Sequence, residues 1–240
     1  MTVVLATLFA LGLVTSAFAY GGEPNMDMPG TPGAGEPVRD GTHVGEGEHQ
    51  MEGEHQMFRD VAGHWYEDYA RQMAQHRFME GYGDGRFGGG DEITRAQFAG
   101  IMARMMEMAP VAGHPFDDLE GHWAEGHVNA MVMAGIVKGH ADGTFGPHEP
   151  ITRAQMAAMM DRALEHVGAG LGEQERQQLR DMLREHFGDV AGHWAEGHIA
   201  HMYQLGITLG DAEGHFRPDE HTTRAQGAAM LWRLYEGQLQ

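Results

Sequence analysis

One short sequence occurs three times in this chain of 240 residues, and it limits how the chain can fold. The sequence is Thr-Arg-Ala-Gln, beginning at Thr94, Thr152 and Thr223. A Thr at a helix N-cap can accept a hydrogen bond from the amide three residues later, and a Gln there can accept one from the cap amide. Each copy therefore predicts a helix that starts with a capping box. The closing residues are Gln97, Gln155 and Gln226.

Aromatic residues keep a constant distance from this motif. In every copy a Trp stands 29 residues before the Thr, and a Phe follows that Trp by 22 residues. Constant spacing in three copies is the sequence signature of a repeated structural unit. We expect both aromatic residues in the core of the unit, with sugar stacking by the Trp as the alternative. They are Trp65, Trp123 and Trp194, and Phe87, Phe145 and Phe216.

Each unit is predicted to consist of a helix, a loop and a second helix. In the second copy, Val128, Met131 and Val132 follow the i, i+3, i+4 pattern of one buried helical face. Asp142-Gly143 then favours a tight turn, and the capped helix follows. We therefore expect a mainly α fold with repeats at 58–110, 111–168 and 187–240. Residues 169–186 are additional, and their polar composition predicts an extra surface helix.

The chain before residue 58 is predicted to contain an export signal and a linker. Residues 3–14 are almost all apolar, and Ala17-Phe18-Ala19 fits a signal-peptidase site, so we expect residues 1–19 to be a cleaved signal peptide. An uncleaved membrane anchor is the alternative, because the segment lacks a basic start. Residues 20–57 are rich in Gly, Pro and Glu and are predicted to be a disordered linker.

This linker contains a short His- and Met-rich tract. Imidazole, thioether and carboxylate groups together can bind a soft or borderline metal, so weak copper, zinc or nickel binding is one interpretation. A low-complexity spacer without metal is the other. The candidate ligands are His43, His49, His55, Met51 and Met57.

Composition excludes several classes of protein. The 16 Lys and Arg residues face 35 Asp and Glu residues, a formal charge of −19, and such an acidic chain does not favour nucleic-acid binding. There are no cysteines, which rules out disulfides and thiol chemistry. No nucleophile motif, phosphate loop or His-Glu-x-x-His pattern is present, so we expect no enzyme activity.

The arginine of the motif lies where a cation is unfavourable, beside the positive end of the helix dipole. Two roles fit its presence in all three copies. It can clamp a carboxylate or phosphate together with the free amides of the helix N-terminus, or it can pair with an acidic residue of a neighbouring repeat. These arginines are Arg95, Arg153 and Arg224.

Taken in order, Phe-x-Asp-Val, His-Trp-Ala, Gly-x-x-Asp-Gly-x-Phe and Ile-Thr-Arg-Ala-Gln resemble the S-layer homology domain, over about residues 58–236. The resemblance implies three helical repeats in a pseudo-threefold arrangement that bind cell-wall polysaccharide in grooves between neighbours. It implies a pyruvylated wall polymer held partly by the motif arginines, beside Thr94, Thr152 and Thr223 and Gln97, Gln155 and Gln226. The family usually has Glu at the Gln position, and Gln keeps the cap but removes a negative charge.

The resemblance therefore predicts an exported, non-catalytic protein of the cell wall or cell surface. Its expected partners are wall polysaccharide or a peptidoglycan-linked polymer, with S-layer or other envelope proteins as further partners. After signal cleavage no transmembrane segment is expected, and no cofactor is expected beyond weak metal binding. The alternative function is an envelope metal-binding or buffering protein that uses the His/Met tract.

Overall fold

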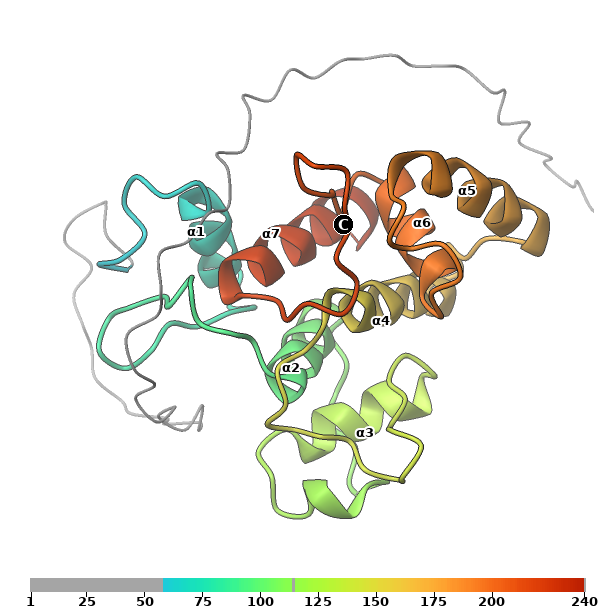
Figure 1. Ribbon diagram of the computed structural model, residues 1–240. Coiled ribbons are helices and arrows are strands. Elements are labelled where there is room, and N and C mark those ends of the chain that lie inside the picture. The colour runs from blue at the N-terminus through green and yellow to red at the C-terminus, as the bar shows by residue number, and fades with distance from the viewer. Residues whose placement is uncertain (1–57, 114, 240) are drawn as a thin grey trace, which may run out of the picture. The chain divides into compact units, whose positions relative to one another are not determined.

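The computed structural model describes residues 58–113 and 115–239 (Figure 1). The predicted signal peptide and linker lie outside these residues. The described chain is mainly helical, as predicted, and it contains isolated β-bridges but no β-strand. Its α-helices are α1 (Glu67–Gln75), α2 (Arg95–Met105), α3 (Glu125–Met133), α4 (Arg153–His166), α5 (Glu173–His186), α6 (Glu196–Gln204) and α7 (Arg224–Leu234). A 3₁₀ turn, η1 (Asp117–Leu119), precedes α3, and a π-helical turn, η2 (Tyr235–Leu239), follows α7.

The three motif copies begin α2, α4 and α7, and all three form the predicted capping box. In α4, the amide of Gln155 donates to Thr152 Oγ1 at 3.2 Å, and the amide of Thr152 donates to Gln155 Oε1 at 3.1 Å. Two amides that the helix itself leaves without partners are thereby satisfied. The inserted residues between the second and third repeats form α5, which packs on α6.

Helices pack across repeats. The capped helix of each repeat contacts the first helix of another repeat: α2 packs on α3, α4 on α6 and α7 on α1 (Figure 1). The last of these pairs joins the end of the described chain to its beginning. A sequence repeat is therefore not a packing unit by itself, because its two helices find their partners in different repeats.

A cycle of backbone hydrogen bonds joins the residues that precede the three caps. The amide of Ile151 donates to Ile93, that of Ile93 donates to Thr222, and that of Thr222 donates to Ile151, each at 3.0 Å. Such a cycle supports a threefold arrangement of the repeats, which stays a prediction.

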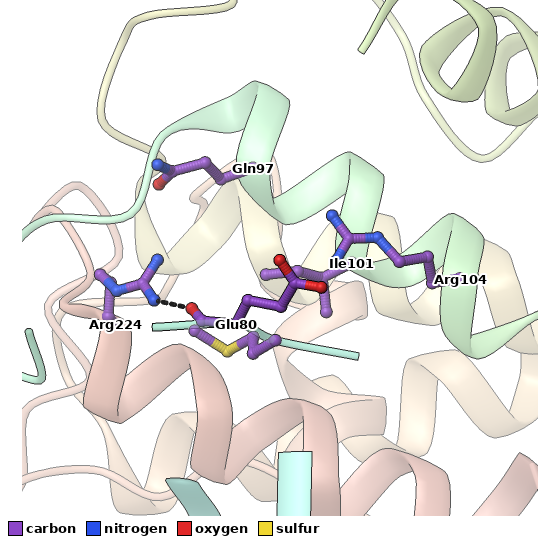
Figure 2. A pocket seen from close by; sticks show the side chains of 6 residues that line it. Glu80, Gln97, Ile101, Arg104 and Arg224 are labelled. Atoms are coloured by element: carbon purple, nitrogen blue, oxygen red, sulfur yellow. Dashed lines mark hydrogen bonds between the residues drawn. The ribbon is translucent and has the colours of Figure 1, made fainter. Parts of the chain in front are cut away.

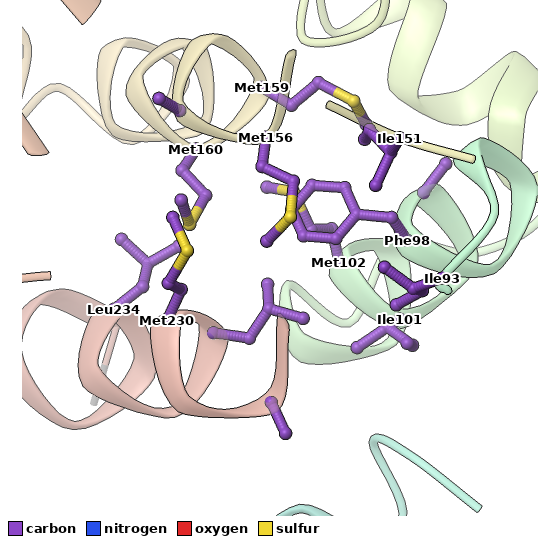
Figure 3. Packing of buried hydrophobic residues seen from close by; sticks show 14 of the residues in the cluster. Ile93, Phe98, Ile101, Met102, Ile151, Met156, Met159, Met160, Met230 and Leu234 are labelled. Atoms are coloured by element: carbon purple, nitrogen blue, oxygen red, sulfur yellow. The ribbon is translucent and has the colours of Figure 1, made fainter. Parts of the chain in front are cut away.

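The core lies between the three capped helices and is rich in methionine. Figure 3 shows side chains from α2, α4 and α7 meeting there. Methionine fills irregular space well because its unbranched side chain has three rotatable bonds, and several methionines of the capped helices are buried here. Among them are Met102, Met156, Met160 and Met230.

The aspartate that follows each repeat's first Phe fixes the glycine loop. Asp118 accepts hydrogen bonds from the amides of Phe145 and Gly146, at 3.0 Å and 2.7 Å. Asp60 and Asp189 bind the corresponding amides in the other repeats. These carboxylates hold the loop so that its Phe points into the core, and Phe87, Phe145 and Phe216 are fully buried.

Replacing Thr222 by valine should stabilise the protein. Thr222 is fully buried where the other repeats have Ile, and its hydroxyl has no hydrogen-bond partner in the described chain. Removing an unsatisfied buried hydroxyl at nearly constant shape should raise the free energy of unfolding by about 1 kcal/mol, or the melting temperature by roughly 2–4 °C. Thr152→Val is the matched control and should destabilise by about 1 kcal/mol, because it removes a cap. A fall in melting temperature for Thr222→Val would show that the hydroxyl has a partner.

Candidate functional site

The arginine of each motif reaches into another repeat. Arg153 shows this most clearly: its Nε donates to the carbonyl oxygen of Phe216 at 2.7 Å, and its Nη2 donates to that of Leu209 at 2.8 Å. Its guanidinium carbon lies 4.6 Å from the centroid of the Phe216 ring, a cation–π contact. Arg153 therefore ties the start of α4 to the glycine loop of the third repeat.

The other two motif arginines make the same set of contacts with their own neighbours. Arg95 reaches from the first repeat to the second, and Arg224 reaches from the third back to the first. Each donates Nε to the carbonyl of the buried Phe and Nη2 to a carbonyl seven residues earlier. The acceptors are Phe145 (2.8 Å) and Lys138 (3.4 Å) for Arg95, and Phe87 (2.9 Å) and Glu80 (2.7 Å) for Arg224.

These contacts bear on one of the two roles considered for the motif arginines, pairing with an acidic residue of a neighbouring repeat. For Arg95 and Arg153 the hydrogen-bond acceptors in the neighbouring repeat are main-chain carbonyls. Burial lowers the pKa of both guanidinium groups, and nearby carboxylates oppose that effect. Because arginine nevertheless stays protonated in proteins, each junction between repeats holds a permanent, largely buried cation.

A second row of arginines, which the sequence analysis missed, lies beside the first. Each stands nine residues after a motif arginine, on the same helix, and donates to a carbonyl of its own repeat. The constant spacing in all three copies is the signal that could have revealed them. The pairs are Arg104 with Phe78 (3.0 Å), Arg162 with Ile136 (3.4 Å) and Arg233 with Ile207 (3.4 Å).

A small pocket lies where the two rows meet at the contact between the third and first repeats (Figure 2). The segment of Met79 and Glu80 runs between Arg224 on one side and Arg104 on the other. Figure 2 shows the Glu80 side chain extending toward Arg104. Gln97 and Ile101 of α2 complete the lining.

The same residue positions recur at the other two contacts, where the arginines make equivalent hydrogen bonds. We call the three sets junctions A, B and C. Junction A, the pocket, consists of Met79, Glu80, Gln97, Ile101, Arg104 and Arg224. Junction B consists of Arg95, Val137, Lys138, Gln155, Met159 and Arg162. Junction C consists of Arg153, Thr208, Leu209, Gln226, Met230 and Arg233.

The glutamine of each motif belongs to both the cap and the junction. Gln97 lines the pocket while its Oε1 accepts the hydrogen bond from the Thr94 amide. Its oxygen is thus committed to the cap, so the NH₂ group is the part that can serve a ligand. The Thr hydroxyls are likewise engaged by the amide of the Gln, which limits Thr94, Thr152 and Thr223 to supporting the helix start.

The three tryptophans are not core residues, and that prediction is wrong. Their exposed fractions are 37% for Trp65, 38% for Trp123 and 58% for Trp194. The next residue in each copy is buried instead, namely Tyr66, Ala124 and Ala195. Apolar spacing could not distinguish these two adjacent positions, because they differ by only one residue at the turn into the helix.

Trp123 lies against a glycine of the adjacent capped helix and close to the second arginine row. A Cβ placed on Gly100 would lie 3.0 Å from Trp123 Cζ3 and 3.7 Å from Arg104 Nη2. The indole ring and the guanidinium therefore flank the same point of α2. This arrangement places an exposed aromatic surface next to a cation that lines junction A.

The described chain is a repeat protein in which three helical repeats meet at junctions lined by arginines. The chain belongs to the S-layer homology domain family, whose model matches residues 58–99, 115–157 and 186–228. These three matches agree with the three tandem repeats predicted from the sequence. The family places the protein outside the cytoplasm, as an anchoring module of the cell surface or cell wall.

Several proteins are similar to this chain over most of its length. A cell surface glycoprotein of Acetivibrio thermocellus is 32% identical over 68% of this chain, and an S-layer protein of Bacillus licheniformis is 32% identical over 72%. A cellulosome-anchoring protein of Acetivibrio thermocellus is 32% identical over 62%. The matched part is only 7%, 19% and 34% of these relatives' own lengths. An endoglucanase of a Bacillus species is also similar, at 31% identity, so the module also occurs within enzymes.

Two other predictions concern membrane-spanning segments and metal binding. Within residues 58–113 and 115–239, no helix combines the length and hydropathy needed to cross a bilayer. The same residues hold no group of three or more His, Asp or Glu side chains arranged for a metal ion. The predicted ligands His43, His49, His55, Met51 and Met57 lie outside the described residues, and metal binding there stays a prediction.

Proposed function

We propose that this protein is a non-catalytic anchor that binds an anionic cell-wall polysaccharide at the junctions between its repeats. The observation that carries the proposal is the pairing, at each junction, of two arginines from different repeats. A planar guanidinium suits a carboxylate because it can donate two parallel hydrogen bonds. Main-chain carbonyls already hold these guanidinium groups, so little side-chain entropy remains to be lost on binding.

The distribution of charge supports an anionic ligand. The chain carries a formal charge of −19, yet six of its 15 arginines and its one lysine belong to the three junctions. An acidic surface repels polyanions in general, whereas a local cluster of cations attracts a carboxylate that fits it. The combination favours selective binding of a sugar acid over non-specific attachment to anionic polymers.

The exposed tryptophans support a carbohydrate. A large aromatic surface left exposed at the same position in three repeats is a feature of binding sites, and the apolar face of a sugar ring can stack on an indole. Trp123 lies beside the arginine row, as the Gly100 geometry shows. A ligand with a carboxylate and a neighbouring sugar ring would use both features at once.

The residue types that all three junctions share favour binding over catalysis. Arginine and glutamine donate hydrogen bonds but do not transfer protons at neutral pH, and Ile101, Met159 and Met230 contribute apolar surface only. Two relatives are named as an S-layer protein and as a cellulosome-anchoring protein, which agrees with an anchoring role. A pyruvyl ketal, which adds a carboxylate to a neutral hexose, is the ligand group that we propose.

The test is co-sedimentation with wall sacculi that carry a pyruvylated polymer. The protein should pellet with these sacculi and should stay in solution after mild acid has removed the ketals, because the carboxylates would then be lost. Sacculi stripped of the whole polymer serve as the control. Equal binding before and after ketal removal would exclude the proposed ligand group, and no binding to either preparation would exclude the wall-anchoring function.

A further inference from the structure

One position differs in charge among the three junctions. It is the residue whose carbonyl accepts Nη2 of the motif arginine: Glu80 in junction A, Lys138 in B and Leu209 in C. Because the three carbonyls are held by equivalent arginines, the three side chains start from equivalent points. All three side chains are exposed. A ligand therefore meets a carboxylate at junction A, an ammonium at junction B and an apolar group at junction C.

We infer that this position decides which junction takes the anion, and that Lys138 makes junction B the anionic-sugar site. The inference rests on the proposed function and adds to it a residue that determines specificity. Lys138 is the one lysine in the chain. Junction B thus combines Arg95, Arg162 and Lys138, while junction A offsets its two arginines with Glu80 and junction C has two arginines beside Leu209.

The charged groups around the motif arginines of junctions B and C sum to the same net charge of −2, so the two junctions differ through Lys138 and Leu209. Two carboxylates, Glu149 and Asp118, act electrostatically on Arg95. Asp118 is engaged by the Phe145 and Gly146 amides, and Glu149 lies 3.0 Å from His140 Nε2. Both carboxylates are therefore already engaged by groups of the glycine loop.

At junction C the same net charge comes from a different set of groups. Three carboxylates, Glu220, Asp211 and Asp189, and one further cation, Arg217, act electrostatically on Arg153. Asp189 accepts hydrogen bonds from the loop amides, and Asp211 pairs with Arg217 at 2.7 Å.

An aromatic platform is also best developed beside junction B. Trp194 lies two residues before the start of α6, and α6 packs on α4, the helix that carries Gln155, Met159 and Arg162 of this junction. With an exposed fraction of 58%, Trp194 presents more surface than Trp65 or Trp123. The most cationic junction therefore adjoins the most exposed tryptophan.

A single lysine allows a direct test. Reductive methylation with ¹³C-formaldehyde labels Lys138 and the chain's N-terminal amine, and a dimethylated lysine keeps its charge. The labelled full chain would be titrated with soluble pyruvylated wall polymer and with the same polymer after ketal removal, and followed by ¹H–¹³C NMR. We expect the Lys138 signal to shift with the first polymer only, while the N-terminal signal serves as the internal reference.

Charge variants supply the matched controls. Lys138→Glu should weaken binding of the soluble polymer about 10-fold to 100-fold, the range for losing one hydrogen bond to a charged group. Leu209→Glu should change it less than about threefold, and Glu80→Lys should create a second binding site per chain. Within residues 58–113 and 115–239 these three exposed side chains make no hydrogen bond or ion pair, so circular dichroism should be unchanged.

The outcomes separate this inference from the proposed function. If the unmodified chain binds the polymer, Lys138→Glu binds it equally well and the Lys138 signal does not shift, the inference is overturned and the anchor function is left intact. Equal losses for Lys138→Glu and Leu209→Glu overturn it as well, because the anion would not distinguish the junctions. Absence of binding by the unmodified chain overturns both.

Discussion

Replacing Asp161 by alanine should lower the free energy of unfolding by about 3–5 kcal/mol, the usual cost of removing one partner from a buried ionic cluster. Asp161 is fully buried on α4 and joins three helices. Its carboxylate lies 2.5 Å from Nδ1 of His198 and 2.5 Å from Nδ1 of His201, both on α6, and 2.8 Å from Nη1 of Arg176 on α5. Its loss would leave three donors facing each other without an acceptor.

Urea unfolding of the variant would measure this change. Asp181→Ala on the exposed side of α5 is the control, since its partners there are Gln177 and Arg184 at the surface and the expected change is below about 1 kcal/mol. An Asp161→Ala effect as small as that of the control would show that the cluster does not hold α5 in place.

The pH dependence of this effect has a defined sign. Burial by itself raises the pKa of Asp161, but hydrogen bonds from His198, His201 and Arg176 outweigh it and hold the pKa well below its ordinary value. A carboxyl whose folded pKa is lowered contributes its stability above the unfolded pKa of about 3.9 and loses it as the pH falls. The difference between the unmodified protein and Asp161→Asn should therefore shrink as the pH falls below about 4.

Replacing Arg153 by alanine should also destabilise the fold, by about 3 kcal/mol. The substitution removes two hydrogen bonds from a charged donor and leaves the Phe216 and Leu209 carbonyls without that donor. Arg153→Lys should recover only part of the loss, because an ammonium cannot donate in the forked geometry of a guanidinium. Thermal or urea unfolding of the three proteins would measure the series.

Arg71→Ala provides the control for Arg153. Arg71 is half-buried on the surface of α1 and pairs with Glu67 and Asp68 within its own helix, so its loss should cost about 0.5 kcal/mol or less. An Arg153→Ala effect no larger than this would mean that the motif arginines do not hold the repeats together. If the predicted effect is found, loss of wall binding in such variants is not by itself evidence of ligand contact, and Lys138 is the better residue to test.

Some of the fold was predictable because its determinants are local. The capping boxes of Thr94, Thr152 and Thr223 depend on two side chains three residues apart, and all three form. The buried face of the first helices and the additional helix after residue 169 were also evident from spacing and composition, and the family was identified from the resemblance of the repeated motifs. In the candidate site, the motif arginines were identified, but Arg104, Arg162 and Arg233 were not, although their spacing was equally constant.

The limits of the sequence lie at contacts between residues far apart in the chain. A repeated motif determined that three equivalent helices would form, where each would start, and that each would carry an arginine at its first position. Only the tertiary structure decided that α2, α4 and α7 pack on helices of other repeats, and that Arg224 reaches a carbonyl 144 residues away.

The tertiary structure also decided the surroundings of single residues. It exposed Trp65, Trp123 and Trp194 while burying the residue after each, and it brought two histidines and an arginine to Asp161. The physical reason is that capping and helix periodicity act within one or two turns. Which surface a helix covers, and which carbonyl a buried cation reaches, depend instead on how segments distant in sequence exclude water together.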